Sequence, residues 1–289
     1  EKLTGRNICH PSNAAPLGLL NARDRCWDEE IINKLGFGDM VLPELALNDY
    51  EVCGTYYKNG KAIPIFPDYG DQQIAILGCN TEKGDGVVNI ATACQVSVIT
   101  DKFIPGKYEL RPYFEGMYLS TISNMPAGRG LDVLIGLIKD VVYRVADLQV
   151  STEDVWQKIK NGFVMDTQGL LVDMSFYATS DNLNGGSISR INHNNLCVNS
   201  LISAAFKDMA GTYKENFKIL HKLEPISAVV CSGGVSWKNP ELIKVIRQEI
   251  GLPCRLSPLE DETLAGLYRA AQCCIGINKS MKNKIDLVL

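Results

Sequence analysis

The chain has 289 residues, 46% of them hydrophobic, so it can bury one or two hydrophobic cores and is not an unstructured chain. Its formal net charge of -4 and its sequence pI near 5.5 leave no surplus of cations to neutralise phosphates, so nucleic acid is not an expected partner. The polar N-terminus and the shortness of every apolar stretch lead us to expect a cytoplasmic protein without membrane association.

Cysteine and histidine spacing argues against disulfides and zinc. The ten cysteines are scattered, no Cys-x-x-Cys occurs, and only Cys273 and Cys274 are adjacent, a pattern typical of reduced, buried thiols. The three histidines lie far apart, and none has a second ligand at a metal-binding spacing. We expect no structural zinc site.

The first part of the chain predicts a helix, a hairpin and a second helix. Residues 28–36 have apolar positions at helical spacing and end at Gly36, a common helix stop. A hairpin is predicted over 54–66, because Asn59 and Gly60 at its centre tolerate the positive φ of a tight turn. The next helix follows the polar stretch 67–73.

The middle of the chain is predicted to hold β segments followed by two helices. The β segments are rich in β-branched and aromatic residues. A break at 124–130 separates them from the helices, and the second helix has Ser151 or Thr152 as its cap and acidic residues in its first turn. The predicted strands lie at 87–90, 96–99 and 108–119, and the helices at about 131–148 and 152–163.

The last part predicts alternating strands and helices. A loop rich in Gly, Ser and Asn and a long helix come first, and a Gly-Gly turn follows the first strand. Such alternation is typical of an α/β fold, in which a glycine turn at a strand end approaches a nucleotide. The loop is predicted at 178–191, the helices at about 196–223, 240–250 and 262–274, and the strands at 228–231 and 253–256.

Asp71 is a candidate for proton abstraction. It follows a glycine at a predicted helix start, where a carboxylate can accept the proton of an alcohol nucleophile in phosphoryl transfer. Gln72 can donate and accept hydrogen bonds, which suits sugar hydroxyls. The alternative is that Asp71 only caps the helix, the commonest role of an Asp in this position.

The small-residue turn at 90–94 could hold phosphates. It offers backbone N–H groups and the Thr92 hydroxyl without bulky side chains, a composition that suits the terminal phosphates of a nucleotide. The alternative is a plain hairpin turn.

A second set of glycines has a similar double interpretation. Gly233 and Gly234 after an apolar strand allow the backbone to approach a ligand closely, or simply form a tight strand-to-helix turn. The same holds for Gly128. Asn239, before Pro240, either caps the next helix or contacts adenine.

Taken in order along the chain, these motifs resemble the FGGY carbohydrate kinases. The stretch at 70–73 matches the family's catalytic-base segment, that at 88–96 its phosphate-side hairpin, and that at 232–242 its adenosine segment. Looser matches extend the similarity from about Thr4 to Ala271. These lie at 11–15, 111–119, 128 and 185–189.

The chain departs from the family pattern in three ways. Ala91 stands where the family usually has a glycine before the phosphate-site threonine, and Arg190 replaces a glycine further on. The family's Asp-x-Gly-Thr phosphate loop, which precedes these motifs, does not occur. The resemblance therefore predicts a fragment that is incomplete for catalysis by itself.

The resemblance implies an α/β, actin-like ATPase fold, which is ribonuclease-H-like, with two lobes and a nucleotide cleft. Residues 1–76 would be the C-terminal part of the first, sugar-binding lobe, and 77–289 the second, nucleotide-binding lobe. The implied activity is transfer of the γ-phosphate of ATP to a sugar hydroxyl, and the expected sugar is a ketose such as sedoheptulose. The alternatives are another FGGY activity, on xylulose, glycerol or a deoxysugar, and a non-catalytic nucleotide-binding homologue.

The resemblance also assigns roles to residues. Asp71 would be the general base, and Gln72 and Asn13 would contact the sugar. ATP would carry Mg²⁺, with Asp71 as the candidate protein ligand, and a homodimer is expected. The residues assigned to the nucleotide are Thr92, Ala93, Gly128, Gly233, Gly234, Val235 and Asn239.

Overall fold

The structure is a computed structural model that describes residues 2–177 and 185–282. The chain divides into two compact units, each assembled from separate stretches. Unit 1 comprises Glu1–Asp85, Ser97–Thr121 and Ser257–Leu289, and unit 2 comprises Gly86–Val96 and Ile122–Leu256. The predicted lobe boundary at residue 76 refers to the lobes of the family and stays a prediction.

Unit 1 begins with short elements that hold one another in pairs. Strands β1 and β4 pair in parallel, and β2 and β3 pair antiparallel. The predicted hairpin is confirmed as β5–β6, with positive φ at Asn59 (51°) and Gly60 (74°). The elements are β1 (Ile8–Cys9), α1 (Pro11–Ala14), β2 (Leu20–Asn21), β3 (Cys26–Trp27), α2 (Glu29–Lys34), β4 (Glu44–Leu45), β5 (Gly54–Lys58), β6 (Lys61–Ile65), α3 (Asp71–Gly78), β9 (Glu109–Pro112) and α9 (Glu262–Cys274).

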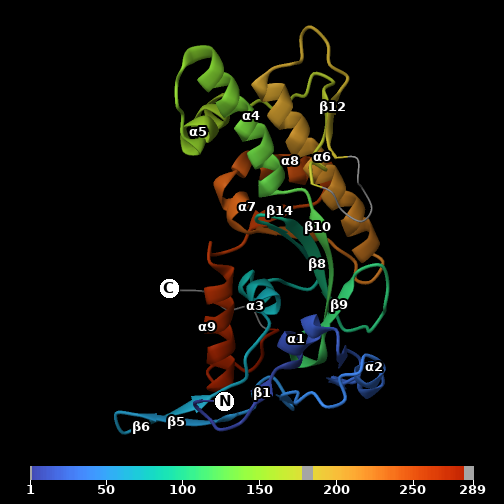
Figure 1. Cartoon of the computed structure of the whole chain (residues 1–289), viewed down its shortest axis with the longest axis vertical. Helices are drawn as coiled ribbons and strands as arrows, with labels where there is room; N and C mark the ends of the chain where they lie inside the picture. The colour runs from blue at the N-terminus through green and yellow to red at the C-terminus, as the bar shows by residue number, and fades with distance from the viewer. Residues whose placement is uncertain (1, 178–184, 283–289) are drawn as a thin grey trace. The chain divides into compact units, whose positions relative to one another are not determined.

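Helices α3 and α9 of unit 1 lie side by side (Figure 1) and pack through two glycines. A Cβ atom at Gly78 would overlap the carbonyl oxygen of Glu262, and one at Gly266 would overlap that of Ile74. Arg269, only 2% exposed, donates to the Leu77 carbonyl at 2.8 Å and so closes the last turn of α3. This packing fixes the helix that begins at Asp71.

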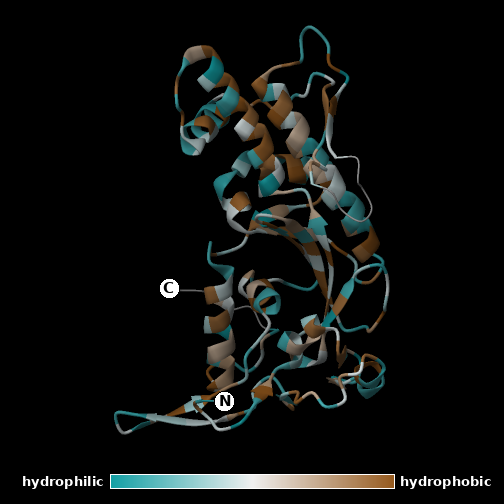
Figure 2. Ribbon diagram, viewed as in Figure 1, coloured by the Kyte–Doolittle hydropathy of each residue, from teal (hydrophilic) through white to brown (hydrophobic). Residues whose placement is uncertain are grey.

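Six strands form one mixed sheet in the order β14-β13-β7-β8-β10-β9. Hydrophobic residues follow its central strands (Figure 2), and Val88, Ile90, Val96 and Leu119 have no exposed surface, as expected for strands covered on both faces. Strands β13 and β14 pair in parallel, and β9 and β10 antiparallel. The strands not yet given are β7 (Asp85–Ile90), β8 (Cys94–Thr100), β10 (Tyr118–Met125), β13 (Ala228–Ser232) and β14 (Cys254–Leu256).

The predicted β segment at 108–119 is two strands rather than one. A short 3-10 turn at Phe114–Gly116, in which Glu115 has a φ of 51°, separates β9 from β10. Strand β10 then continues to Met125, into the stretch predicted to be a break. The predicted break is therefore only the few residues before the next helix.

Unit 2 contains the long helices. The predicted helices are confirmed, and α5 has a capping box in which Ser151 and Asp154 bond each other's backbone N–H groups. The predicted loop at 178–191 contains a strand at its end, while 178–184 lie outside the described residues. The elements are α4 (Gly128–Ala146), α5 (Thr152–Gly162), β11 (Leu171–Asp173), β12 (Ser187–Ser189), α6 (Val198–Leu220), α7 (Gly234–Lys238) and α8 (Pro240–Ile250).

Helix α4 starts earlier than predicted. The sequence placed its first residue near 131, but the helix begins at Gly128. The reason is non-local, because the N–H groups of Gly128 and Arg129 find acceptors in the turn between β7 and β8. Within the described residues, no helix is both long and apolar enough to cross a membrane.

Candidate active site

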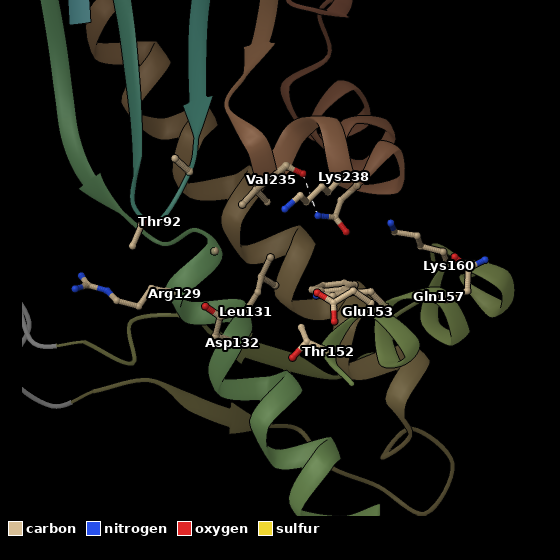
Figure 3. Close-up of a pocket in the computed structure, with 14 residues that line it drawn as sticks. Thr92, Arg129, Leu131, Asp132, Thr152, Glu153, Gln157, Lys160, Val235 and Lys238 are labelled. Atoms are coloured by element: carbon tan, nitrogen blue, oxygen red, sulfur yellow. Dashed lines mark hydrogen bonds between the residues drawn. The ribbon is translucent and has the colours of Figure 1, made fainter. Parts of the chain in front are cut away.

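A pocket of about 480 Å³ in unit 2 is the candidate nucleotide site (Figure 3). Its volume lies in the range of small-molecule sites, roughly 300–1,000 Å³. It is formed by the β7–β8 turn, the start of α4, helix α5 and helix α7. Its lining residues are Ala91, Thr92, Gly128, Arg129, Leu131, Asp132, Thr152, Glu153, Trp156, Gln157, Lys160, Val235, Lys238 and Asn239.

The β7–β8 turn is held against the start of α4. The N–H of Gly128 donates to the Ala91 carbonyl at 3.0 Å, and that of Arg129 donates to the Thr92 carbonyl at 3.1 Å. A Cβ at Gly128 would lie 2.8 Å from the Ala91 oxygen and 3.1 Å from a methyl of Val235. Gly128 therefore allows the close approach that places Thr92 in the pocket wall, and its N–H is engaged by the turn.

Gly233 allows a second close approach. It has a φ of +83°, and a Cβ there would lie 2.5 Å from the Ile90 carbonyl oxygen at the end of β7. Gly234 follows as the first residue of α7. Four of the predicted nucleotide residues line the pocket: Thr92, Gly128, Val235 and Asn239. The other three, Ala93, Gly233 and Gly234, are not among its lining residues and instead shape the backbone around it.

Asn239 lies between helices α7 and α8 and is 5% exposed. Its side-chain amide donates to the Val235 carbonyl at 3.0 Å, a bond drawn in Figure 3. It makes no side-chain capping bond to α8, although it occupies the N-cap position. The capping alternative is therefore wrong for the side chain, and the adenine contact stays a prediction.

Charged residues that the sequence did not single out surround the pocket. The pocket lining includes three cations, Arg129, Lys160 and Lys238, and two carboxylates, Asp132 and Glu153. Figure 3 shows Arg129 at the Thr92 end and Lys160 at the other end. An excess of cations in a concave site favours a polyanionic ligand.

The side chains of α4 and α5 in this wall are fixed by neighbours in unit 2. The Arg129 guanidinium lies 4.2 Å from the ring centroid of Tyr177, a cation–π contact. Trp156 stacks on Phe206 with the ring planes 9° apart. Their positions depend on tertiary packing, which explains why no local pattern marked them.

Metal ligation by the protein alone has no support in the described part of the chain. No group of three or more His, Cys, Asp or Glu side chains there could hold a metal ion. The pocket does contain the carboxylates of Asp132 and Glu153. Mg²⁺ typically binds one or two carboxylates together with substrate phosphates, so these residues fit a Mg²⁺–nucleotide.

Asp71 is the first residue of α3 in unit 1, and its side chain is exposed. Gly70 occupies the N-cap position in an extended conformation, so the alternative that Asp71 is the N-cap is wrong by one residue. One carboxylate oxygen of Asp71 accepts the Gln72 N–H at 2.7 Å. An exposed carboxylate at a rigid helix start can meet a substrate hydroxyl.

Gln72 is held at both ends of its amide. Its Nε2 donates to the Thr121 hydroxyl at 2.9 Å, and its Oε1 accepts from Arg111 at 3.0 Å. Arg111 is itself paired with Glu109, and the Thr121 hydroxyl lies 2.8 Å from that of Ser97. The amide predicted to contact a sugar is thus oriented by a polar network.

Asn13 lies on α1 and is exposed. Its side-chain amide donates to the Asp68 carboxylate. Asp68 lies three residues before Asp71, so the structure brings Asn13 to the segment that leads into α3.

The chain has curated relatives among sugar and glycerol kinases. It is 25% identical to the sedoheptulokinase of Mus musculus over 163 residues, which cover 52% of this chain and 33% of that protein. It is 34% identical to the glycerol kinase of Thermococcus kodakarensis over 106 residues, which cover 36% of this chain and 21% of that protein. The matches thus span a third or less of these relatives, and no family model matches the chain.

Solved kinases share the fold of nearly the whole chain. The xylulose kinase from Rhodospirillum rubrum matches with a TM-score of 0.80 at 13% identity, covering 97% of this chain and 58% of that one. The Plasmodium falciparum glycerol kinase solved with ADP matches with a TM-score of 0.75 at 18% identity, covering 98% and 59%. These matches confirm the predicted α/β, actin-like ATPase fold. The chain is therefore similar in sequence, over part of its length, to sugar and glycerol kinases, and similar in fold, over nearly all of its length, to carbohydrate kinases of known structure.

Proposed function

We propose that the protein is an ATP-dependent carbohydrate kinase that transfers the γ-phosphate of ATP to a sugar hydroxyl. The observation that carries the proposal is the pocket of unit 2, where Thr92, Gly128, Val235 and Asn239 line one cavity. These four residues come from three separate stretches of chain, and the family resemblance assigns each of them to the nucleotide. The kinase names of the relatives support the same activity.

The nucleotide is proposed to place its phosphates at the Thr92 end of the pocket. Arg129 lies at that end, where its charge would stabilise phosphate oxygens. Val235 and Asn239 would flank the adenosine. ADP in the matching Plasmodium falciparum glycerol kinase supports an adenine nucleotide as ligand.

Mg²⁺ is proposed to enter with ATP. When bound, it neutralises charge on the transferring phosphates. Asp132 and Glu153 are the pocket carboxylates that could hold it, while Asp71 remains the candidate ligand from unit 1.

Asp71 is proposed to accept the proton of the attacking sugar hydroxyl. The sugar oxygen then forms a bond to the γ-phosphorus, the bond from that phosphorus to the β–γ bridging oxygen breaks, and ADP leaves. Gln72 and Asn13 would orient the sugar. The network that fixes the Gln72 amide supports this role, because an oriented donor and acceptor loses little freedom on binding.

The substrate is proposed to be a ketose such as sedoheptulose. The support is the match to sedoheptulokinase over about half of the chain. Glycerol and xylulose are the rival acceptors, because glycerol kinase matches a shorter stretch at higher identity and xylulose kinase shares the fold. A panel of these acceptors and a deoxysugar ranks them directly.

The deciding experiment measures ADP formation from ATP and Mg²⁺ with each acceptor by the full protein, and compares Asp71→Asn with Asp39→Asn, an exposed aspartate also in unit 1. Loss of general-base catalysis should lower turnover by about a hundredfold or more in Asp71→Asn and leave nucleotide binding intact. Asp39→Asn should behave as wild type. Binding of ATP without turnover of any acceptor would instead indicate a non-catalytic homologue.

A homodimer in the cytoplasm is also part of the proposal. Helix α4 carries exposed apolar side chains at four-residue intervals, at Val133, Leu137, Val141 and Val145, and such stripes are commonly buried when helices pair. Sedimentation analysis of wild type and Leu137→Glu tests this, and a wild-type monomer at all concentrations contradicts it.

A further inference from the structure

Three buried polar side chains of unit 1 form a continuous hydrogen-bonded chain in the order serine, histidine, aspartate. His10 Nδ1 lies 2.7 Å from Ser12 Oγ, and His10 Nε2 lies 2.8 Å from Asp49 Oδ1. Ser12, His10 and Asp49 are 0%, 1% and 5% exposed. Buried polar groups in a fully bonded network fix one local geometry.

The arrangement resembles a hydrolytic triad, but its serine is not placed to attack a substrate. Ser12 has no exposed surface, and its oxygen already accepts the N–H of Gly70 at 3.0 Å. His10 Nδ1 also accepts the N–H of Ser12 at 3.1 Å and thereby caps helix α1. With Nδ1 as the acceptor, Nε2–H donates to Asp49 and the Ser12 hydroxyl donates to Nδ1.

The serine end of this hydrogen-bonded network holds the start of α3. Gly70 is the N-cap of that helix, and its carbonyl accepts the N–H of Ile74 at 3.0 Å. A Cβ at Gly70 would lie 2.7 Å from the Ser12 carbonyl oxygen, so Ser12 contacts the cap closely through side chain and backbone. Gln73 donates to that same carbonyl at 3.4 Å. Ser12 therefore fixes the residues on both sides of Asp71.

The aspartate end is anchored as firmly. The second oxygen of Asp49 accepts the N–H of Glu115, and its backbone carbonyl accepts the Tyr69 hydroxyl at 2.6 Å. Burial raises the pKa of Tyr69 well above its usual value, which keeps the phenol available as a donor. Because Tyr69 precedes Gly70, the network returns to the segment that leads into Asp71.

We propose that Ser12, His10 and Asp49 are positioning residues that orient Asp71 for proton transfer from the acceptor hydroxyl. This inference rests on the kinase function proposed above. The three side chains are buried, so they are not placed to bind the acceptor or the nucleotide themselves. They act through Gly70, and a small displacement of a general base costs a large part of its effect.

The test compares Ser12→Ala with Ser12→Thr in the full protein, using Ser257→Ala as the matched control. Ser257 is a buried serine of unit 1, 2% exposed, whose hydroxyl bonds Glu262 at 2.8 Å. Ser12→Ala removes the acceptor for Gly70 and should lower kcat about tenfold with the KM for ATP unchanged. Ser257→Ala should keep wild-type kcat.

Ser12→Thr separates positioning from plain stability. It keeps the hydroxyl but adds a methyl group to a fully buried site, so it should be less stable than Ser12→Ala and yet recover most of the wild-type kcat. If activity instead follows stability across the two variants, or if Ser12→Ala keeps wild-type kcat, the positioning role is overturned.

Hydrogen exchange supplies a readout that does not depend on activity. Peptides covering 69–78 should exchange faster in Ser12→Ala than in wild type, and at the wild-type rate in Ser257→Ala. Absence of turnover by wild type would remove the proposed function, while faster exchange would still show that Ser12 holds the start of α3. Unchanged exchange in Ser12→Ala would overturn the inference whatever the activity.

Discussion

Gly78 on α3 lies directly against the backbone carbonyl of Glu262 on α9. No room for a Cβ exists on either helix at this crossing, because Gly266 meets the Ile74 carbonyl in the same way. The two backbones therefore touch, which side chains of ordinary size would prevent.

Gly78→Ala should destabilise unit 1. The new methyl must displace backbone rather than a flexible side chain, so we expect a loss of about 3 kcal/mol or more in the free energy of unfolding, measured by denaturant titration. The matched control is Gly136→Ala on α4, where nothing lies within 4 Å of the new Cβ. That change should stabilise the protein by about 0.5–1 kcal/mol. Equal changes in the free energy of unfolding for the two substitutions would contradict the close contact between α3 and α9.

Gly128→Ala should weaken nucleotide binding. Its Cβ would lie 2.8 Å from the Ala91 carbonyl oxygen and should push the turn that carries Thr92 away from α4. We expect about a tenfold rise in the dissociation constant for ATP, measured by calorimetry. Gly211→Ala on α6, where the Cβ meets nothing within 4 Å, should leave binding unchanged. Wild-type affinity in Gly128→Ala would show that the turn does not hold phosphate.

Arg129→Gln should discriminate between nucleotides. If Arg129 contacts phosphate oxygens, its loss should weaken ATP about tenfold and leave adenosine unaffected. Arg144→Gln, on the same helix but paired with Asp140 at 2.9 Å, is the control and should change neither affinity. Equal weakening of ATP and adenosine would place Arg129 away from the phosphates.

Asp208→Asn should raise stability near neutral pH. Burial raises the pKa of this carboxyl in the folded protein above its ordinary 3.8. As the pH rises from 3.8 through the folded-state pKa, the carboxyl ionises more readily in the unfolded chain than in the folded protein, and stability is lost. Asparagine removes the cost and its amide oxygen can still accept the Met174 N–H. The gain in Tm should be largest near a pH of about 7 and should shrink toward about 4. Exposed Asp101→Asn is the control, and a gain that does not vary with pH would contradict the electrostatic cause.

Local signals in the sequence predicted elements well where the cause of the element was local. The acidic first turn and Ser151 predicted α5, and Asn59–Gly60 predicted the β5–β6 hairpin. The start of α4 was missed, because the Gly128 N–H is held by a hydrogen bond to the Ala91 carbonyl, which is distant in the sequence and leaves no local pattern. Helix α7 was also not predicted, because its five residues between Gly233 and Asn239 are too few to show a helical pattern.

In the candidate site, too, the residues with a local sequence signal were predicted, and those positioned by tertiary packing were not. Thr92 belongs to a recognisable small-residue turn and Val235 to the segment that resembles the family's adenosine segment, and the pocket contains both. Lys160 and Trp156 were missed, because α5 looks like any amphipathic surface helix until its neighbours are known. His10 and Asp49 lie 39 positions apart in the chain, and only folding brings them into contact.

The crossing of α3 and α9 also has a consequence for how the protein is made. As the ribosome releases the chain, every residue of unit 2 emerges by Leu256, whereas α3 must wait for α9 to appear at Glu262. Unit 2 can therefore fold during synthesis, and the packing face of α3 stays uncovered until α9 has been translated. Unit 1, which carries Asp71, is completed last.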